Sequence, residues 1–337
     1  MRDHRTELSA WQTRPARWLG ALLAIAALVL PAGSARAEYP DKPITFIVGL
    51  AAGGGVDTYA RTLAALMQKD LGKPINIVNK TGGGQVIALK AFLEQKPDGY
   101  TLFFHSGTTS LVTHIQGRAP ASPITDMRTV GSVGALSAAL CVPAASPFKS
   151  AKDVVEAIRK QPGKLRWGHP GRGSNHHLSG AGFLAANKLV AQDVPTKGGS
   201  KARVLLAANQ VDFGFIGIQL ITGFEAKIRC LGVVPHRADP VLSSYKPLNT
   251  QGFKSPDVST PMVLAAPKGT PDAIYDKLVK AAAKAAKSPE FDQILRRAGL
   301  GAAYMSPKEA VDYLKTVHGE IKPLVSSTLM GTDKGKK

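Results

Sequence analysis

The fold is indicated first by residues 44–57, which read ITFIVGLAAGGGVD. The first five of these residues are β-branched or aromatic, which predicts a strand. A glycine-rich turn follows, and apolar residues then recur at helical spacing over residues 57–71. The same order of strand, turn and helix returns along the chain, which predicts an α/β protein with parallel, doubly wound sheets. Further strands are expected at residues 75–78, 100–104, 138–143, 165–168, 211–216, 228–234 and 261–266, and further helices at 86–95, 154–160, 175–188, 204–208, 271–287, 289–298 and 307–318.

This alternation fits two α/β lobes. We expect one lobe to combine residues 38–137 with 259–337 and the other to contain residues 138–258. Two helix starts carry sequence signals: Thr270 is the expected N-cap of the helix at 271–287, with Pro271 in its first turn, and Ser306 is expected to begin the last helix.

The N-terminus has the pattern of an export signal. Residues 1–17 carry four arginines, residues 18–30 are apolar, and Ala35-Arg36-Ala37 is a small-x-small cleavage site. A membrane anchor is the alternative, but the apolar stretch is too short for a hydrocarbon core of about 30 Å. We therefore expect cleavage after Ala37, giving a periplasmic chain that starts at Glu38.

Composition excludes several classes of protein. The chain has 337 residues, 44% of them hydrophobic, which is normal for a globular protein and excludes wholesale disorder. Lys and Arg number 43 against 24 Asp and Glu, a formal charge of +19. The basic residues are scattered and the chain carries an export signal, so nucleic acid is not expected as a partner. Attraction to anionic solutes or an anionic membrane surface, and a solvated basic surface without a specific role, both remain open.

The two cysteines, Cys141 and Cys230, lie in strand-like segments. Two cysteines are too few for a disulfide-framework miniprotein or a four-cysteine zinc site. In an oxidising compartment they could form a disulfide, and two free buried thiols are the alternative. The sequence leaves both possibilities open.

The glycine loop is the first candidate ligand site. We expect main-chain N–H groups of Ala52, Gly53, Gly54 and Gly55 to bind an anion beside a helix N-terminus, with Asp57 capping that helix. A tight turn is the alternative, but one glycine would suffice for it. The spacing matches neither a phosphate loop nor the dinucleotide fingerprint, so no nucleotide cofactor is expected.

A second candidate follows the expected strand at residues 100–104. Ser106, Gly107 and Thr108 stand at its C-terminal end, where open α/β sheets bind ligands. Hydroxyl groups there could donate to a carboxylate. A Ser/Thr helix cap is the structural alternative, and it is compatible with ligand contact.

A third candidate lies in the central part of the chain. Gly173 and Ser174 resemble the first loop at a helix start, Arg172 could bind a carboxylate through two hydrogen bonds, and His176 follows. An exposed arginine is the alternative for Arg172. His176 and His177 are adjacent, so on a helix they point about 100° apart and would not share a metal ion. We expect no metal.

Two further observations concern charge and catalysis. Thr196 and Lys197 form a fourth candidate, where Lys197 could attract an anion or be an ordinary surface lysine. No nucleophile elbow or other catalytic spacing is present, so we expect binding and not turnover, without a cofactor. An exported hydrolase that uses Ser106 or Ser174 with a neighbouring histidine is the rival class, and a periplasmic sensor of a membrane kinase is another.

Eight segments together resemble the Bug-type family, the extracytoplasmic substrate-binding proteins of tripartite tricarboxylate transporters. The segments are YPDKPI at residues 39–44, GGGVD at 53–57, KPDGYTL at 96–102, PGKL at 162–165, GSNHHL at 173–178, KGG at 197–199, NQVD at 209–212 and APKGTP at 266–271. The resemblance implies a type II periplasmic-binding-protein fold, in which two doubly wound lobes close on a ligand cleft. It implies a small carboxylate ligand, held largely by main-chain amides, and a two-component membrane permease as partner. We expect a monomer.

The chain departs from the family pattern at three positions. Ala52 replaces a proline, Thr196 replaces a tyrosine, and Ile216 stands where an acidic or amide residue is common. Loss of a carboxylate at Ile216, together with Arg172, favours a dicarboxylate or aromatic carboxylate without an amino group.

Overall fold

A computed structural model describes residues 38–330 except residues 197, 237–238 and 240. The expected signal peptide therefore lies outside the described residues. Pro40–Lys337 clusters as one unit, and the descriptions below concern that unit. Within it the strands form a continuous path in the order β2-β1-β3-β9-β4-β7-β5-β6, with β10 and β8 paired to β4 beside it.

The first part of this path combines both ends of the chain. β1 (Ile44–Val48) is parallel to β2 (Ile75–Asn79) and to β3 (Thr101–Ser106). β9 (Ser259–Pro267) then pairs antiparallel with β3, and β4 (Met127–Pro143) pairs antiparallel with β9. The last strand, β10 (Ala302–Met305), is antiparallel to β4. The expectation of a parallel sheet is therefore confirmed for β1, β2 and β3 and wrong for β9 and β4, and β10 was not predicted.

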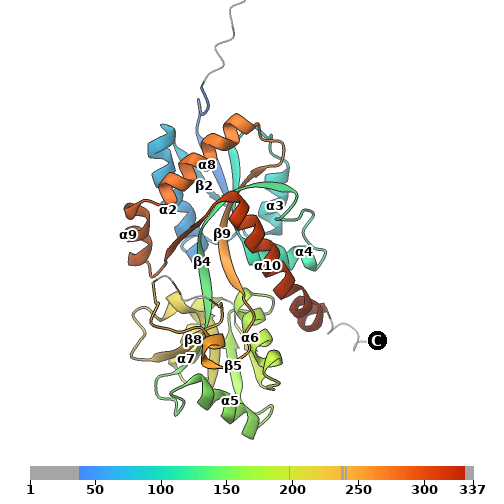
Figure 1. The fold of residues 1–337 in the computed structure, drawn as a ribbon, viewed down its shortest axis with the longest axis vertical. Coiled ribbons are helices and arrows are strands. Elements are labelled where there is room, and N and C mark those ends of the chain that lie inside the picture. Colours follow the sequence, from blue (N-terminus) through green and yellow to red (C-terminus); the bar gives the residue numbers. More distant parts are fainter. Residues whose placement is uncertain (1–37, 197, 237–238, 240, 331–337) are drawn as a thin grey trace, which may run out of the picture. The chain divides into compact units, whose positions relative to one another are not determined.

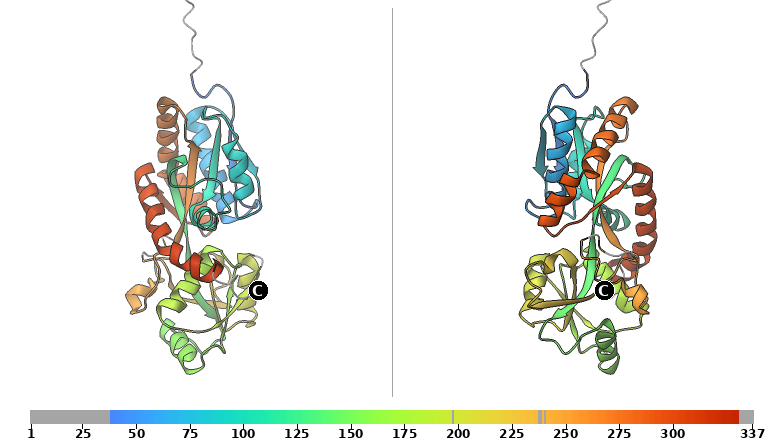
Figure 2. Two further views of the ribbon diagram at one scale, coloured as in Figure 1. Left: turned by 90° about the vertical axis from the view of Figure 1, so that its right-hand side faces the viewer. Right: turned by 60° about the vertical axis from the view of Figure 1, so that its left-hand side comes forward.

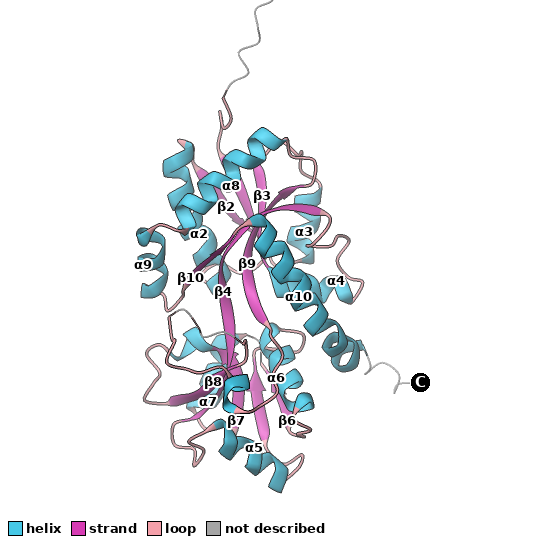
Figure 3. Cartoon of the chain, viewed as in Figure 1, coloured by secondary structure: helices cyan, strands magenta, loops and turns pink. Residues whose placement is uncertain are grey.

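The second part of the path is built on the far end of β4. This strand pairs with β7 (Phe213–Gly217) and β8 (Ile228–Val233), antiparallel in both cases. β5 (Arg166–His169) is parallel to β7 and to β6 (Gln192–Pro195). Figure 3 shows β4 running through both groups of strands. One long strand, antiparallel to its neighbours in both groups, thus links two cores of parallel strands.

The sequence predicted only the second half of β4. Gly131 and Gly134 interrupt the apolar pattern of the first half, and the register with β9 shifts beside both of them. Glycine inside a strand marks a bulge or a close approach of another group. At Gly134 the reason is packing, because a Cβ would collide with the ring of the buried Tyr59.

Helices cover both groups of strands, as Figure 1 shows. Around the first group lie α2 (Gly55–Leu71), α3 (Val86–Leu93), α4 (Gly107–Ile115), α8 (Asp272–Ala286), α9 (Pro289–Arg297) and α10 (Pro307–Val325). Around the second group lie α5 (Ala151–Lys160), α6 (Asn175–Ala186) and α7 (Gly199–Ala207). Short 3₁₀ segments occupy Ile218–Ile221 and Leu248–Gln251, and a π-helical turn occupies Ser326–Met330.

α5 illustrates how sequence makes these helices. Ser150 accepts a hydrogen bond from the Asp153 amide while the Asp153 carboxylate accepts one from the Ser150 amide, which is a capping box. Val154, Val155 and Ile158 lie on one face of the helix and are buried in a cluster with Trp167. Burial of each such side chain contributes about 1.5–3 kcal/mol, so the packed face, and not helix propensity, holds α5 in place.

Of the two N-cap residues predicted near the C-terminus, one is confirmed and one is wrong. Ser306 caps α10 through a capping box with Glu309, as expected. Thr270 does not cap α8, so that prediction is wrong: its hydroxyl donates to the Pro267 carbonyl at 2.8 Å. Pro271 occupies the N-cap position instead, without a side-chain cap.

α10 is longer than expected and reaches α6, a helix of the second group. It runs to Val325, and Figure 2 shows its end beside α6. Leu178 of α6 packs in one apolar cluster with Ile321 and Val325, and Leu329 of the following turn packs against that cluster. The helix at the C-terminus therefore belongs to the surroundings of α6.

Two further features bear on the environment of the protein. Cys141 of β4 and Cys230 of β8 are paired in register and form a disulfide. Over the described part of the chain, no helix combines the length and the apolar character that a membrane crossing requires.

Candidate functional site

A cavity of about 520 Å³ lies where several helices begin. The residues that line it at these helix starts are Val56 of α2, Gly84 before α3, Ser106 and Thr109 of the α4 start, Ser174 and Asn175 of the α6 start, and Gly198 before α7. The first N–H groups of a helix have no partner within the helix, and the helix dipole adds partial positive charge there. Five helix N-termini at one cavity make a site for an anion.

The charged side chains around the cavity have the same preference. Arg118 and Arg172 line it, and no Asp or Glu is found among the described residues of its wall. The Arg118 guanidinium donates to the Gln116 side chain and to the Gly83 carbonyl, each at 3.2 Å. It is thereby fixed beside the cavity while keeping its charge. The wall therefore favours a negatively charged ligand over a cation.

The glycine loop contributes less main chain to this cavity than the sequence suggested. Leu50 and Val56 line the cavity, whereas the loop between them does not. Ala52, Gly53 and Gly54 are exposed to solvent. The Gly53 amide donates to the Asp57 carboxylate at 2.8 Å, and the Gly54 amide donates to the Ala51 carbonyl at 3.4 Å. Ligand binding by residues 52–55 stays a prediction that requires these amides to change partners.

Asp57 fixes the glycine loop through a hydrogen bond from the Gly53 amide. It is 2% exposed and accepts hydrogen bonds from Gly53, from Arg61 and from the Asn79 amide group. Burial works to raise its pKa, but these donors outweigh burial and keep the pKa below the ordinary value. Gly54 is the N-cap of α2, so Asp57 lies in the first turn and does not occupy the cap position predicted for it.

Of the three expected residues after β3, one lines the cavity and two pack into the protein interior. Ser106 lines the cavity and caps α4 by accepting from the Thr109 amide at 3.4 Å. Gly107 and Thr108 do not line it. The Thr108 hydroxyl donates to the Ser259 carbonyl at 2.7 Å, and a Cβ on Gly107 would meet Leu314 and Pro261. Thr109, the next residue of the same candidate segment, lines the cavity in their place.

The loop before α6 supplies the largest group of expected residues. Arg172, Gly173, Ser174 and His176 all line the cavity. Ser174 caps α6 by accepting from the His177 amide at 3.2 Å. Burial lowers the pKa of His176 to about 4, so its imidazole is neutral in the folded protein near neutral pH. This part of the wall is polar, but apart from Arg172 it is uncharged.

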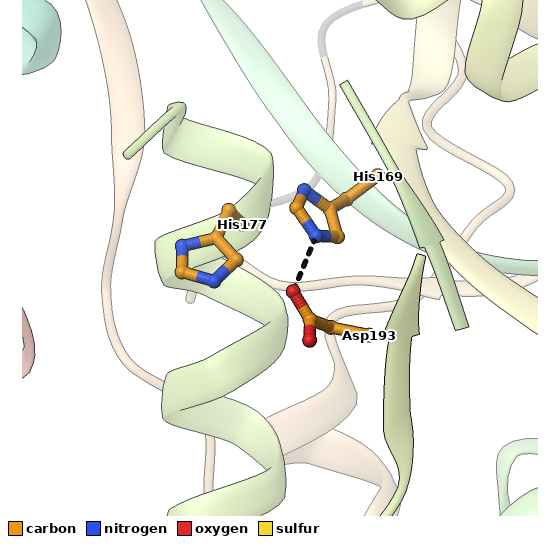
Figure 4. Close-up of side chains that lie close together, drawn as sticks. All are labelled: His169, His177 and Asp193. Atoms are coloured by element: carbon orange, nitrogen blue, oxygen red, sulfur yellow. Dashed lines mark hydrogen bonds and ion pairs between the residues drawn. The ribbon is translucent and has the colours of Figure 1, made fainter. Parts of the chain in front are cut away.

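Arg172 is already paired with a carboxylate. Its Nε and Nη2 donate to the two oxygens of Asp193 at 2.8 and 3.0 Å. The Nε2 of His169 also contacts Asp193, at 3.4 Å from the carboxylate oxygen Oδ2, and Figure 4 shows this pair. The hydrogen bonds from Arg172, more than those from His169, hold the pKa of Asp193 below its ordinary value. Binding of a ligand carboxylate by Arg172 stays a prediction, in competition with Asp193.

His169, His177 and Asp193 are also close enough to suggest a metal site, with ligand atoms within 4.8 Å of one another. Their hydrogen bonds do not suit a cation. The Gly171 and Gly173 amides donate to Nδ1 of His169 and His177, at 3.2 and 3.3 Å. The ring protons must then sit on Nε2, where a metal would bind, and Arg172 already neutralises Asp193.

Residues 59–328 match the family described as "Tripartite tricarboxylate transporter family receptor". The chain belongs to this family. It is 28% identical over 302 residues to the "UPF0065 protein in tcbD-tcbE intergenic region" of Pseudomonas sp. strain P51, covering 88% of this chain and 90% of the relative. Among solved structures it resembles the periplasmic binding protein BugD, with 26% identity, a TM-score of 0.67 and coverage of 88% of this chain and 98% of BugD. It also resembles MatC from Rhodopseudomonas palustris with bound malate, with 25% identity, a TM-score of 0.70 and coverage of 85% of this chain and all (100%) of MatC.

These comparisons confirm the type II periplasmic-binding-protein fold and the Bug-type resemblance. Receptors of this family are periplasmic substrate-binding proteins. Two residues assigned from the family pattern nevertheless lie away from the cavity. Ile216 is fully buried in an apolar cluster, so it carries no information about a ligand amine. The Thr196 hydroxyl lies 3.0 Å from both the His169 and Gly198 carbonyl oxygens. Lys197 lies outside the described residues.

The serine and histidine pairs of the rival hydrolase do not form. His105 is fully buried, with its Nδ1 at 3.0 Å from the Ser110 hydroxyl, whereas the Ser106 hydroxyl bonds to Thr109. Burial lowers the pKa of His105 to about 4. Ser174 is occupied as a helix cap. Among the described contacts, neither predicted serine therefore has its hydroxyl hydrogen-bonded to a histidine ring nitrogen.

Sequence reasoning missed several residues of the wall. Thr260 and Leu136 face each other on β9 and β4. Leu329 comes from the turn after α10. Asn175 also lines the cavity, and it stands within the third candidate segment, between the expected residues Ser174 and His176. Nothing local marks Thr260, Leu136 or Leu329, since tertiary packing alone brings them to the cavity.

Proposed function

We propose that this protein captures a small carboxylate in the cavity of about 520 Å³ and delivers it to a two-component membrane permease. The protein would be exported through the signal peptide at residues 1–37 and act as a periplasmic monomer. Residues 38–137 with 259–337 and residues 138–258 would form two lobes that close on the ligand, with hinges near residues 138 and 258. No bond of the ligand is made or broken in this cycle.

One observation carries the proposal: five helix N-termini and two arginines surround a cavity whose described wall contains no carboxylate. A carboxylate needs several hydrogen-bond donors when it leaves water, and the first N–H groups of a helix, which have no partner within the helix, are donors of this kind. Arg118 adds positive charge without filling the cavity, and Arg172 adds its charge where the ligand carboxylate displaces Asp193. A cationic ligand would find no partner of opposite charge in the same wall.

The comparisons support the ligand class and the partner. MatC, at 25% identity, has malate bound in its structure, and malate is a small dicarboxylate. The family description names receptors of tripartite tricarboxylate transporters, which supports a membrane permease as the partner. Coverage of 85% of this chain means that the likeness includes most of the described residues.

A ligand screen tests the proposal. Protein purified from the periplasmic fraction is heated with di- and tricarboxylates, aromatic acids and amino acids, one compound at a time. A bound acid at about 100 times its Kd should stabilise the folded state by about 2.7 kcal/mol and raise Tm. Chromatography of the recovered compound should show it unchanged. Absence of any acid that raises Tm, or consumption of the compound, would contradict the proposal.

A further inference from the structure

Asn175 lines the cavity, and its side-chain amide has no hydrogen-bond partner within the described structure. The residue is 5% exposed and lines the cavity at the start of α6. Neither its Nδ2 nor its Oδ1 has a hydrogen-bond partner within the described structure. Because both atoms are unpaired, the conclusion is the same whichever way the amide is turned. A buried amide that is left unpaired destabilises the folded state, so this side chain is built for a partner that enters the cavity.

Thr260 repeats the pattern on β9. It is 5% exposed, lines the same cavity, and its hydroxyl has no partner among the residues described. The Nε2 of His176, another residue of the wall, is likewise buried and unpaired in the described chain. The neighbouring Thr113 is different, because its hydroxyl lies 3.2 and 3.0 Å from carbonyl oxygens of its own helix. The polar groups of the wall are therefore not all alike: the Thr113 hydroxyl is paired, whereas the Asn175 amide and the Thr260 hydroxyl are not paired with any described residue.

The chemistry of these groups limits what the partner can be. A carboxylate only accepts hydrogen bonds, so it can pair with Asn175 Nδ2 but not with Oδ1. Oδ1 requires a donor from the ligand. A ligand ammonium could donate, but Arg118, Arg172 and the helix N-termini oppose a cation here. A hydroxyl both donates and accepts, so a single hydroxyl can satisfy Oδ1 and also accept from Thr260.

We infer that the ligand is a hydroxylated carboxylate, and that Asn175 and Thr260 bind its hydroxyl group. This inference rests on the proposed function, in which the helix N-termini and the arginines bind the carboxylate. Asn175 and Thr260 would then discriminate between acids of the same carbon skeleton that carry a hydroxyl group and acids that lack it. A site with buried groups that need a ligand hydroxyl discriminates against the analogue that lacks it, because those groups are then left unpaired.

The test compares ligands that differ at one position. Calorimetric titration of the exported protein uses succinate, malate and aspartate, which carry hydrogen, hydroxyl and ammonium on one skeleton. Two further pairs, tricarballylate with citrate and benzoate with 4-hydroxybenzoate, cover larger and aromatic acids. In every set that binds, the hydroxylated member should bind about tenfold more tightly or better than the member without a hydroxyl. Aspartate should bind no more tightly than succinate.

Two variants assign the preference to residues. Asn175→Leu and Thr260→Val keep the volume and remove the polar atoms. Each should weaken the hydroxylated acid by about fivefold or more and change its deoxy partner by less than about threefold. Thr113→Val is the matched control: it also lines the cavity, but its hydroxyl is already paired, so the ratio between the two acids should stay that of the unmodified protein. Tm without ligand checks that each variant is folded.

The outcomes separate the inference from the function on which it rests. Equal binding of the acids with and without a hydroxyl, or binding of aspartate as tight as that of malate, overturns the inference and leaves carboxylate capture standing. An equal loss for both acids in Asn175→Leu shows that Asn175 only shapes the loop, and also overturns it. Absence of binding by every acid in the three sets overturns the inference together with the proposed function. The titrations of the unmodified protein decide the matter even if a variant fails to fold.

Discussion

Arg172 donates two parallel hydrogen bonds to Asp193, and the same arginine lines the ligand cavity. It also lines a second cavity of about 540 Å³, where Asp193 lies in the wall. The Arg172 side chain is 63% exposed, so the pair contributes little to stability compared with a buried one. The Arg172–Asp193 pair matters because of its position: the Asp193 carboxylate competes with a ligand carboxylate for the guanidinium group of Arg172.

Removal of the competitor should strengthen ligand binding. In Asp193→Asn the side chain is neutral and binds a guanidinium less strongly, so Arg172 becomes free for a ligand carboxylate. We expect the affinity for the captured acid to rise by about two- to fivefold, measured by calorimetric titration. Arg172→Gln should lower the affinity, and more for a ligand with two carboxylates than with one. Arg159→Ala, an exposed arginine of α5, serves as control. Unchanged affinity in both variants would remove Arg172 from the site.

Asp57→Asn should destabilise the protein and loosen the glycine loop. All three partners of the Asp57 carboxylate are donors, namely Gly53, Arg61 and Asn79. An amide at this position turns its own NH₂ toward at least one of them, and a buried donor is then left unpaired. We expect a loss of about 1–3 kcal/mol in the free energy of unfolding, measured with urea. Asp276→Asn, an exposed acid of α8, should change it by less than about 0.5 kcal/mol. Similar losses in both variants would mean that the three donors do not matter.

The Asp57 environment shows which parts of the site a sequence can predict. The strand, glycine turn and helix around it follow from local periodicity, and β1 and α2 form where that pattern predicts them. Local pattern also located the starts of α4 and α6, where Ser106 and Ser174 are helix caps in the cavity wall. Residues whose role depends only on the start of their own helix could therefore be predicted from the sequence.

Residues whose role depends on a distant partner were not. Arg172 and Asp193 are separated by 21 positions and meet only because β5 and β6 are neighbours in the sheet. The Gly53 amide, expected to face a ligand, is satisfied by Asp57 instead. The first half of β4 escaped prediction because its glycines accommodate packing against other elements. In each case a tertiary contact outweighs the local pattern.

Reduction of the disulfide should lower stability. Cys141 and Cys230 are 89 positions apart. A disulfide between them closes a long loop in the unfolded chain and so lowers the conformational entropy of the unfolded state. The folded state is stabilised relative to it. We expect a reductant to lower the free energy of unfolding by about 2–5 kcal/mol. The Cys141→Ala, Cys230→Ala double variant should be equally destabilised and insensitive to the reductant. Two free thiols in denatured, unreduced protein would contradict the pairing.

Buried histidines should make the protein sensitive to mild acid. Burial lowers the pKa of His105 to about 4, below the ordinary value of 6.5. Between these two values the unfolded chain binds a proton that the folded chain does not. The contribution of His105 to stability is thus complete above pH 6.5 and is lost as the pH falls toward 4. For one such histidine we expect a loss of about 1–2 kcal/mol between pH 7 and pH 5.

His105→Phe isolates this contribution, because the ring of His105 already stacks on Phe103, with 4.8 Å between ring centroids, and phenylalanine keeps that stacking. The substitution also removes the unpaired Nε2, while Ser110 keeps its hydrogen bond from Gln85. Urea unfolding at pH 7 and pH 5 should therefore show a smaller acid-induced loss in the variant, by about 1–2 kcal/mol, even if the two proteins differ at pH 7. Parallel pH profiles for the unmodified protein and His105→Phe would show that His105 is protonated equally in the folded and unfolded states, and the acid sensitivity would then have to arise from other groups.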